Sequence, residues 1–301
     1  MLSQYAGVSL VNISRRAFLG GGLMMLLGCR GSSGVTVGSK NFTEQLLLGE
    51  MLAQLLENRG LKPVDRRFYL AGTYICHQAL LAGRIDMYVE YTGTALAAVL
   101  KEKPSSNPAQ VLETVKREYA RRFGLQVMPP LGFDNSFAIV MLGADAKRLG
   151  VRTLSQLAGV APTLRIGVGY EFLERPDGYK GLASTYDLRF AEQPRVMDLG
   201  LLYRALESHQ LDVAVGSNTD GLIAALGLAV LEDDKHYFPP YEAIPIVRAE
   251  TLARYPQVGD ALQSIAGKIS AEEMRRMNYA VDGEKKDPAV VVKGFLRQRR
   301  I

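Results

Sequence analysis

ALLAGRIDMYVEYTGT (residues 79–94) and ALESHQLDVAVGSNTD (residues 205–220) lie 126 positions apart and share one pattern. In both segments the end of a predicted helix passes through a turn into a short apolar strand, which small polar residues follow. A second pair of segments, VGSKNF (residues 37–42) and IGVGYE (residues 166–171), repeats at an offset of 129. The sequence therefore predicts two lobes of similar α/β construction.

Strand and helix patterns alternate in the order typical of a mostly parallel sheet covered by helices. Residues 35–39 form a β-rich segment. Residues 43–58 follow with apolar side chains at helical spacing, and Gly60 is expected to end this helix. The fold class predicted from this order is α/β.

Two apolar strands are predicted to carry the chain across from one lobe to the other. Residues 137–141 and 243–247 each follow a turn-prone segment. Two such crossings return the end of the chain to the first lobe. We therefore expect lobe 1 to consist of residues 35–137 and 242–301, and lobe 2 of residues 138–241.

The first 28 residues resemble an export signal. Arg15 and Arg16 precede a short apolar run, and LLGC (residues 26–29) places a small residue before Cys29. This pattern predicts a twin-arginine signal of the lipoprotein type, cleaved before a lipidated Cys29, with a tether over residues 29–34. The alternative is a transmembrane anchor, but the apolar run is far shorter than the roughly 20 residues that a spanning helix needs.

Composition narrows the function. Without its first 28 residues the chain keeps 273 residues, and its net charge falls from +5 to +3 with the loss of two arginines. The remaining basic clusters are short and lack interleaved aromatic residues, so nucleic acid is not an expected partner. Cys76 would be the single cysteine besides Cys29, which leaves no internal disulfide and predicts a buried apolar residue.

No catalytic or metal-binding motif is evident. The three histidines, His77, His209 and His236, are dispersed and do not have the spacing of a zinc site. The chain also lacks a G-x-S-x-G nucleophile motif and a phosphate-binding P-loop. We interpret Asp86 and Asp212, which are equivalent in the repeat, as strand-edge or capping residues. The sequence predicts no cofactor, no metal and no enzyme activity.

A ligand cleft is expected between the lobes, because open α/β sheets bind ligands where their strands end. The segments expected to line it are residues 38–42, 91–94, 167–175 and 216–220.

Three aromatic residues are predicted to meet near the hinge. Tyr91 ends a strand, while Phe137 and Tyr241 lie at the two crossings. Several ring faces around a small volume attract a cation that makes no hydrogen bonds, such as a quaternary ammonium. The alternative is that these rings pack the hinge.

Charged and hydroxyl side chains near the same cleft suit an anion. Lys40 precedes the start of a long helix, Thr94 follows a strand, and Arg175 belongs to the second lobe. Together they could hold a carboxylate. The alternative is that Lys40 and Arg175 are solvated charges.

Five segments in this order resemble the substrate-binding proteins of ABC importers for glycine betaine, choline and carnitine. They are VGSKNFTE (37–44), EYTGT (90–94), RPDGY (175–179), TDG (219–221) and PYEAIPIVR (240–248). The resemblance covers about residues 35 to 300. It implies a two-lobe, type II periplasmic-binding fold with an aromatic cage for a trimethylammonium group. Lys40, Tyr91, Thr94, Arg175 and Tyr241 match the family's ligand-binding pattern.

Two positions depart from that pattern. Phe137 stands where many relatives carry Tyr, and Ser217 stands where a cage Tyr is usual. Loss of one ring face, worth on the order of 1 kcal/mol, predicts either weak betaine binding or a bulkier or different ligand. Tyr170, Tyr179 or Tyr203 are candidates to fill the gap.

The resemblance implies an exported protein, expected to be a lipid-anchored monomer, that delivers a quaternary ammonium compound to an ABC permease. A sensing lipoprotein that closes on the same ligand remains an alternative, as does a binding protein for another small cationic or amino-acid-like ligand.

Overall fold

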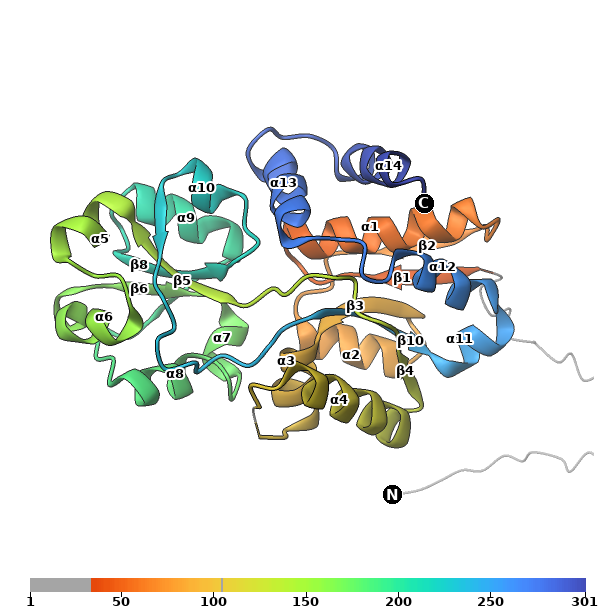
Figure 1. Cartoon of the computed structure of the whole chain (residues 1–301), viewed down its shortest axis with the longest axis horizontal. Coiled ribbons are helices and arrows are strands. Elements are labelled where there is room, and N and C mark those ends of the chain that lie inside the picture. Colours follow the sequence, from red (N-terminus) through yellow and green to blue (C-terminus); the bar gives the residue numbers. More distant parts are fainter. Residues whose placement is uncertain (1–33, 104) are drawn as a thin grey trace, which may run out of the picture. The chain divides into compact units, whose positions relative to one another are not determined.

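The structure is a computed structural model that describes residues 34–103 and 105–301. The predicted signal over residues 1–28, the lipidation site Cys29 and the tether up to residue 33 lie outside the described residues. Figure 1 shows two lobes, each built around one sheet and joined by two connecting segments. Each sheet has five strands.

Helices cover both sheets. In chain order they are α1 (Thr43–Asn58), α2 (Thr73–Leu81), α3 (Thr92–Thr94), α4 (Pro108–Phe123), α5 (Gly143–Leu149), α6 (Leu154–Val160), α7 (Tyr170–Glu174), α8 (Tyr179–Tyr186), α9 (Leu199–Glu207), α10 (Leu222–Ala225), α11 (Ala249–Arg254), α12 (Gln257–Ile265), α13 (Ala271–Asp282) and α14 (Pro288–Arg299). A π-helical turn, Ala95–Leu100, continues α3, and a 3₁₀ turn, Ala161–Thr163, follows α6.

The sheet of the first lobe has the order β2-β1-β3-β10-β4. Its strands are β1 (Val35–Gly38), β2 (Val64–Arg67), β3 (Met87–Tyr91), β4 (Leu125–Val127) and β10 (Ala243–Arg248). Strand side chains alternate between faces, so Met87, Val89 and Tyr91 pack in the core beneath α1, while Tyr88 packs with α2 and α4. This alternation sends Tyr91 and Glu90 to opposite faces at the end of β3.

The sheet of the second lobe has the order β7-β6-β8-β5-β9. Its strands are β5 (Phe137–Leu142), β6 (Ile166–Val168), β7 (Arg195–Val196), β8 (Val213–Ser217) and β9 (Leu228–Val230). β6 pairs in parallel with β7 and β8, whereas β5 runs antiparallel to β8 and β9. α9 packs on one face of this sheet, and α6, α7 and α8 pack on the other.

The predicted repeat is confirmed by element boundaries. α2 and β3 recur as α9 and β8 at the offset of 126. Asp86 accepts the backbone N–H of Thr36 at 2.7 Å, and Asp212 accepts that of Arg165 at 2.8 Å. Both aspartates therefore have the predicted structural role, each fastening the start of a parallel strand.

The two connecting segments between the lobes pair with each other. The first joins β4 to β5, and the second joins β9 to β10 (Figure 1). The backbone N–H of Asn135 donates to the carbonyl of Tyr241 at 3.0 Å, and that of Ala243 donates to the carbonyl of Phe133 at 3.1 Å. Phe137 begins β5 in the second sheet. The predicted lobe boundaries themselves stay a prediction.

Cys76 is fully buried in α2. Burial raises the pKa of its thiol to about 12. The expected role as a buried apolar residue is therefore confirmed.

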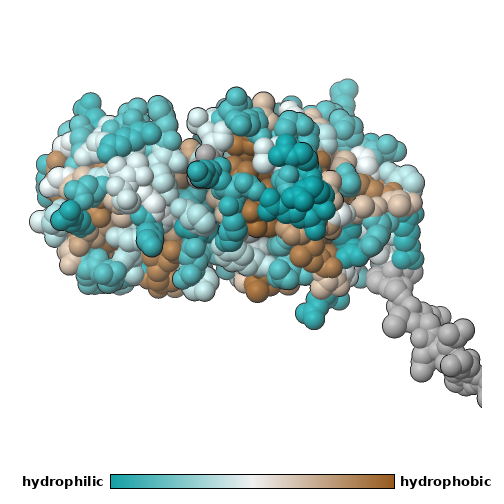
Figure 2. Space-filling model, turned by 90° about the horizontal axis from the view of Figure 1, so that it is seen from below, coloured by the Kyte–Doolittle hydropathy of each residue, from teal (hydrophilic) through white to brown (hydrophobic). Residues whose placement is uncertain are grey.

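Hydrophilic residues cover much of the face seen in Figure 2, and hydrophobic residues lie among them in separate patches. Within the described ranges, no helix combines the length and the apolar character needed to cross a membrane.

Candidate functional site

A cavity of about 920 Å³ opens at the ends of β1, β3, β6 and β8 and takes its lining from both lobes. All seven residues predicted to bind ligand line it: Lys40, Tyr91, Thr94, Phe137, Arg175, Ser217 and Tyr241. Strand ends from two sheets thus converge as expected for this class of fold. Ligand contact by these residues stays a prediction.

Lys40 is a buried cation rather than a solvated one. It is 3% exposed, its ammonium forms an ion pair with Glu90, and it donates to Thr73 Oγ1 at 3.0 Å. Lys40 Nζ also lies 4.8 Å from the centroid of the Tyr91 ring. Glu90, a neighbour of Tyr91 on the other face of β3, therefore balances the charge of Lys40 within the protein.

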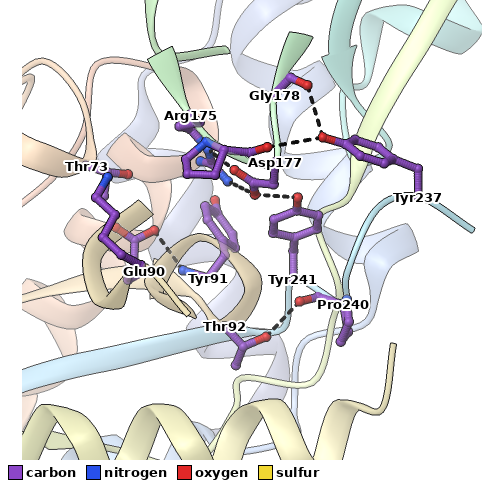
Figure 3. Close-up of polar contacts among 12 residues, drawn as sticks. Thr73, Glu90, Tyr91, Thr92, Arg175, Asp177, Gly178, Tyr237, Pro240 and Tyr241 are labelled. Atoms are coloured by element: carbon purple, nitrogen blue, oxygen red, sulfur yellow. Dashed lines mark hydrogen bonds and ion pairs between the residues drawn. The ribbon is translucent and has the colours of Figure 1, made fainter. Parts of the chain in front are cut away.

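Arg175 has its own carboxylate partner. Its Nε donates to Asp177 Oδ1 at 2.9 Å, and its Nη2 donates to Asp177 Oδ2. Figure 3 shows Asp177 between Arg175 and the hydroxyl of Tyr241, which donates to Oδ2 at 2.7 Å. Burial alone would lower the pKa of Arg175, but Asp177 outweighs it and holds that pKa above its usual value.

The aromatic residues form a connected wall. The rings of Phe137 and Tyr241 are 5.5 Å apart and nearly perpendicular, and Phe172 and Phe238 pack on Phe137 from the second lobe and the second crossing. The guanidinium carbon of Arg175 lies 5.1 Å from the Phe137 centroid and 5.9 Å from that of Tyr241. A ligand cation would share these rings with a cation of the protein.

At position 217, where a cage tyrosine is usual, the structure places Ser217 with Tyr203 beside it. Ser217 pairs with Phe137 across β5 and β8, and its hydroxyl contacts Asn135 and Thr219. Tyr203 lies beside it: a Cβ added at Gly216 would lie 2.0 Å from the Tyr203 hydroxyl. Glycine at 216 therefore makes room for the Tyr203 side chain.

Of the three tyrosines considered as replacements, two line the cavity. Tyr203 is buried and contributes to the lining, as does the largely exposed Tyr170. Tyr179 is not part of the lining and packs near Phe190 instead.

Glu44 is a buried carboxylate that joins the two lobes. Its Oε1 accepts from the Tyr91 hydroxyl and from Asn135 Nδ2, both at 2.6 Å. Its Oε2 accepts from Thr219 Oγ1 at 2.5 Å and from Asn278 Nδ2 at 3.2 Å. Burial raises the pKa of Glu44, although all four hydrogen bonds oppose the rise. Thr219 belongs to the second lobe. Glu44 therefore connects the two lobes and, through the same carboxylate, holds the Tyr91 hydroxyl.

Three carboxylates near the cavity were not predicted from the sequence: Glu44, Glu90 and Asp177. Asp220 was expected in the lining as part of residues 216–220, and it does line the cavity. Strand alternation gave a signal for Glu90, which had to point away from Tyr91. Asp177 follows Arg175 by two residues, but this short spacing alone does not show that the two side chains form an ion pair. Glu44 gains its role from contacts far apart in the chain, such as the one with Thr219, which local patterns do not reveal.

Comparison with known proteins identifies the family. Residues 33–298 match the model of the substrate-binding domain of ABC-type glycine betaine transport systems. The chain is 35% identical to the carnitine transport binding protein of Listeria monocytogenes over 275 residues, which cover 90% of this chain and 89% of that protein.

Two further likenesses agree with this. The ergothioneine transport permease/ergothioneine binding protein of Helicobacter pylori is 37% identical, across 88% of this chain and 47% of that protein. A solved structure described as a glycine betaine/carnitine/choline ABC transporter is 34% identical with a TM-score of 0.72, and the match covers 88% of this chain and 98% of that one. The predicted two-lobe, type II periplasmic-binding fold is confirmed. The chain belongs to the family of substrate-binding domains of ABC-type glycine betaine transport systems.

Proposed function

We propose that the protein is the extracytoplasmic substrate-binding component of an ABC importer, and that it binds a betaine in the cavity between its lobes. The observation that carries the proposal is the convergence of Tyr91, Phe137 and Tyr241 with Lys40 and Arg175 on one cavity. Ring faces suit a quaternary ammonium, and charged donors suit a carboxylate. A betaine carries both groups a short distance apart.

Unused donors support carboxylate binding even though both cations are already paired. A lysine ammonium has three N–H groups, of which Lys40 uses two on Thr73 and Glu90. Arg175 binds Asp177 through Nε and Nη2, and its Nη1 has no hydrogen-bond partner within the described part of the chain. The ligand carboxylate would accept from these remaining donors, with the Thr94 hydroxyl nearby in the lining.

Calorimetry against glycine betaine, carnitine, choline, proline betaine, ergothioneine and common amino acids tests the proposal. We expect carboxylate-bearing quaternary ammonium compounds to bind, and choline, which lacks the carboxylate, to bind more weakly. NMR of the recovered ligand should show no chemical change, as expected for a protein that binds and releases its substrate. If no quaternary ammonium compound binds, the proposed function is wrong.

A Ser217→Tyr variant tests the missing cage wall. A tyrosine ring at this position would add one cation–π face, worth about 1 kcal/mol, and should tighten glycine betaine binding by several-fold to tenfold. Ser217→Ala is the control, because it removes the hydroxyl without adding a ring. Equal affinities for the wild type and the Tyr variant, measured by calorimetry, would contradict the argument.

We also propose that the chain is exported, lipidated at Cys29 and active as a monomer beside its permease. The twin-arginine motif and the LLGC sequence support the first two points. In cell fractionation, Cys29→Ser should move the protein from the membrane fraction to the soluble extracytoplasmic fraction. Retention of the variant at the membrane would count against the lipid anchor.

A further inference from the structure

Glu90 holds a cation and an aromatic residue of the candidate site at the same time. Its Oε1 accepts from the Lys40 ammonium and from the backbone N–H of Tyr91 at 2.9 Å, and Figure 3 shows the second of these bonds. Its Oε2 accepts from the Tyr88 hydroxyl at 3.1 Å. The Glu90 side chain has no exposed surface and does not belong to the cavity lining. Glu90 would therefore act on a ligand through Lys40 and Tyr91 rather than by contact.

This arrangement leaves one N–H group of Lys40 for the cavity. A lysine ammonium carries three N–H groups. Lys40 gives one to Glu90 and one to Thr73 Oγ1 at 3.0 Å. Lys40 lines the cavity, whereas Glu90 and Thr73 do not. The two fixed bonds thus lie on the protein side of the ammonium, and the third N–H remains for the ligand side.

Glu90 also neutralises a cation that would share a ring with the ligand. Lys40 Nζ lies 4.8 Å from the centroid of the Tyr91 ring, which is expected to contact the ligand ammonium. Two like charges beside one ring in a buried site repel each other strongly, because little water screens them. The carboxylate of Glu90 cancels most of this repulsion and still leaves the free N–H of Lys40 as a hydrogen-bond donor.

The charge of Glu90 extends to the second cation of the site. Burial would lower the pKa of Arg175, Asp177 raises it above its usual value, and Glu90 adds to the same rise. The negative charge of Glu90 thus acts at Arg175 as well as at Lys40, the two groups that are proposed to receive the ligand carboxylate.

We propose that Glu90 is a positioning residue that sets the charge selectivity of the site. By orienting and neutralising Lys40, it lets a ligand ammonium bind beside a lysine, so that the cavity prefers a carboxylate that carries an ammonium group to one that does not. This inference rests on the proposed function, because the probes that test it occupy the betaine site. It holds whichever betaine is the natural ligand.

Two probes of the same shape test the proposal by calorimetry. Glycine betaine carries a quaternary nitrogen, and 3,3-dimethylbutanoate has a carbon atom in its place. Both carry the same carboxylate, so the ratio of their affinities isolates the effect of the ammonium charge. In the wild type we expect glycine betaine to bind more tightly by about tenfold or more.

Glu90→Gln removes the charge of the carboxylate and keeps an amide oxygen that can accept from the backbone N–H of Tyr91. The unpaired Lys40 should then repel the ammonium of glycine betaine and leave the uncharged end of the other probe unaffected. We expect the preference for glycine betaine to fall by about tenfold. Glu50→Gln, a second buried glutamate outside the cavity lining, is the matched control and should leave the preference unchanged.

A second pair of variants measures the same charge without an unpaired lysine, in case Glu90→Gln does not fold. Lys40→Met leaves the carboxylate of Glu90 to attract the ligand ammonium, so the preference for glycine betaine should rise by about tenfold. Lys40→Met combined with Glu90→Gln removes both charges and should return the preference to the wild-type value, although both probes lose the donor of Lys40.

A purely structural role for Glu90 would weaken both probes alike and leave their ratio unchanged. The proposal is therefore overturned if Glu90→Gln changes the ratio by less than about threefold, or if the ratio is the same in Lys40→Met and in the double variant. If glycine betaine and all other quaternary ammonium compounds fail to bind the wild type, the proposed function is refuted and this inference with it.

Discussion

Replacement of Arg175 by Ala is expected to weaken ligand binding by about 100-fold or more, because charged hydrogen bonds to the ligand carboxylate are lost. The same change should lower the free energy of unfolding by about 3–5 kcal/mol. The Asp177 side chain has no exposed surface, and without Arg175 its charge would stay buried beside the Tyr241 hydroxyl alone. For a chain of this size the loss corresponds to a drop in Tm of roughly 10 °C.

A double variant, Arg175→Ala with Asp177→Asn, separates the two effects. The amide oxygen introduced at position 177 can still accept from Tyr241, and no buried charge remains. We therefore expect thermal unfolding to recover most of the lost Tm, while calorimetry still shows the loss of binding. Arg175→Lys, which keeps the charge but not the planar fork, should give intermediate affinity.

Two outcomes would contradict this account. Wild-type affinity in the single variant would refute the assignment of Arg175 to the ligand. Recovery of binding in the double variant would show that Arg175 acts only by neutralising Asp177 and does not contact the ligand.

The fold could be predicted from the sequence because the two lobes repeat one local pattern. The boundaries of α2 and β3 recur at α9 and β8 with the offset that was read from residues 79–94 and 205–220. Hydrophobic periodicity and turn residues specify such elements locally. The two crossings followed from strand patterns at 137–141 and 243–247.

The candidate site could be predicted only in part. Strand ends gave the positions of Lys40, Tyr91 and Ser217, since they lie at or just after the end of a β-strand in a fold whose strand ends meet. Arg175 lies farther along the chain, directly after α7. The charge partners escaped prediction because they depend on tertiary packing. Lys40 and Glu90 are 50 residues apart. The sequence alone left both cations as either ligand contacts or solvated charges, whereas the structure pairs each of them with an internal carboxylate.

Replacement of Glu44 by Ala is expected to loosen the closed arrangement of the lobes and to weaken binding. Four donors lose their acceptor, and three of them belong to buried residues, among them the Tyr91 hydroxyl and Thr219 Oγ1 of the second lobe. The sum of such losses is about 3–5 kcal/mol in stability. The apparent affinity for the ligand also falls, in proportion to the smaller fraction of molecules whose lobes are arranged to bind it. Small-angle X-ray scattering with saturating ligand should show a larger radius of gyration than in the wild type.

Glu50→Ala is the matched control for this variant. Glu50 is also a buried glutamate of α1, but it pairs with the partly exposed Arg66 and does not line the cavity. Its loss should lower stability and leave ligand affinity and the radius of gyration unchanged. If Glu50→Ala weakens binding as much as Glu44→Ala does, the effect belongs to helix stability rather than to the contact between lobes.

Glu44→Gln isolates the charge of this carboxylate through the pH dependence of stability. Burial holds the pKa of Glu44 in the folded protein above the ordinary value of 4.5. At pH values between 4.5 and that folded-state pKa, Glu44 therefore takes up a proton when the protein folds. Stability contributed by protonated Glu44 is therefore complete below pH 4.5 and is lost as the pH rises through the folded-state pKa. Asp282, whose pKa is also raised but not by Glu44, titrates alike in both proteins. Asp220 is replaced by Asn in both proteins, because Glu44 is one of the groups that raise its pKa and its titration would otherwise differ between them. In urea unfolding, the stability of the protein with Glu44 relative to Glu44→Gln should thus decrease from about pH 4 to about pH 8. A difference that stays constant or grows over this range would mean that the four hydrogen bonds to Glu44 outweigh its desolvation.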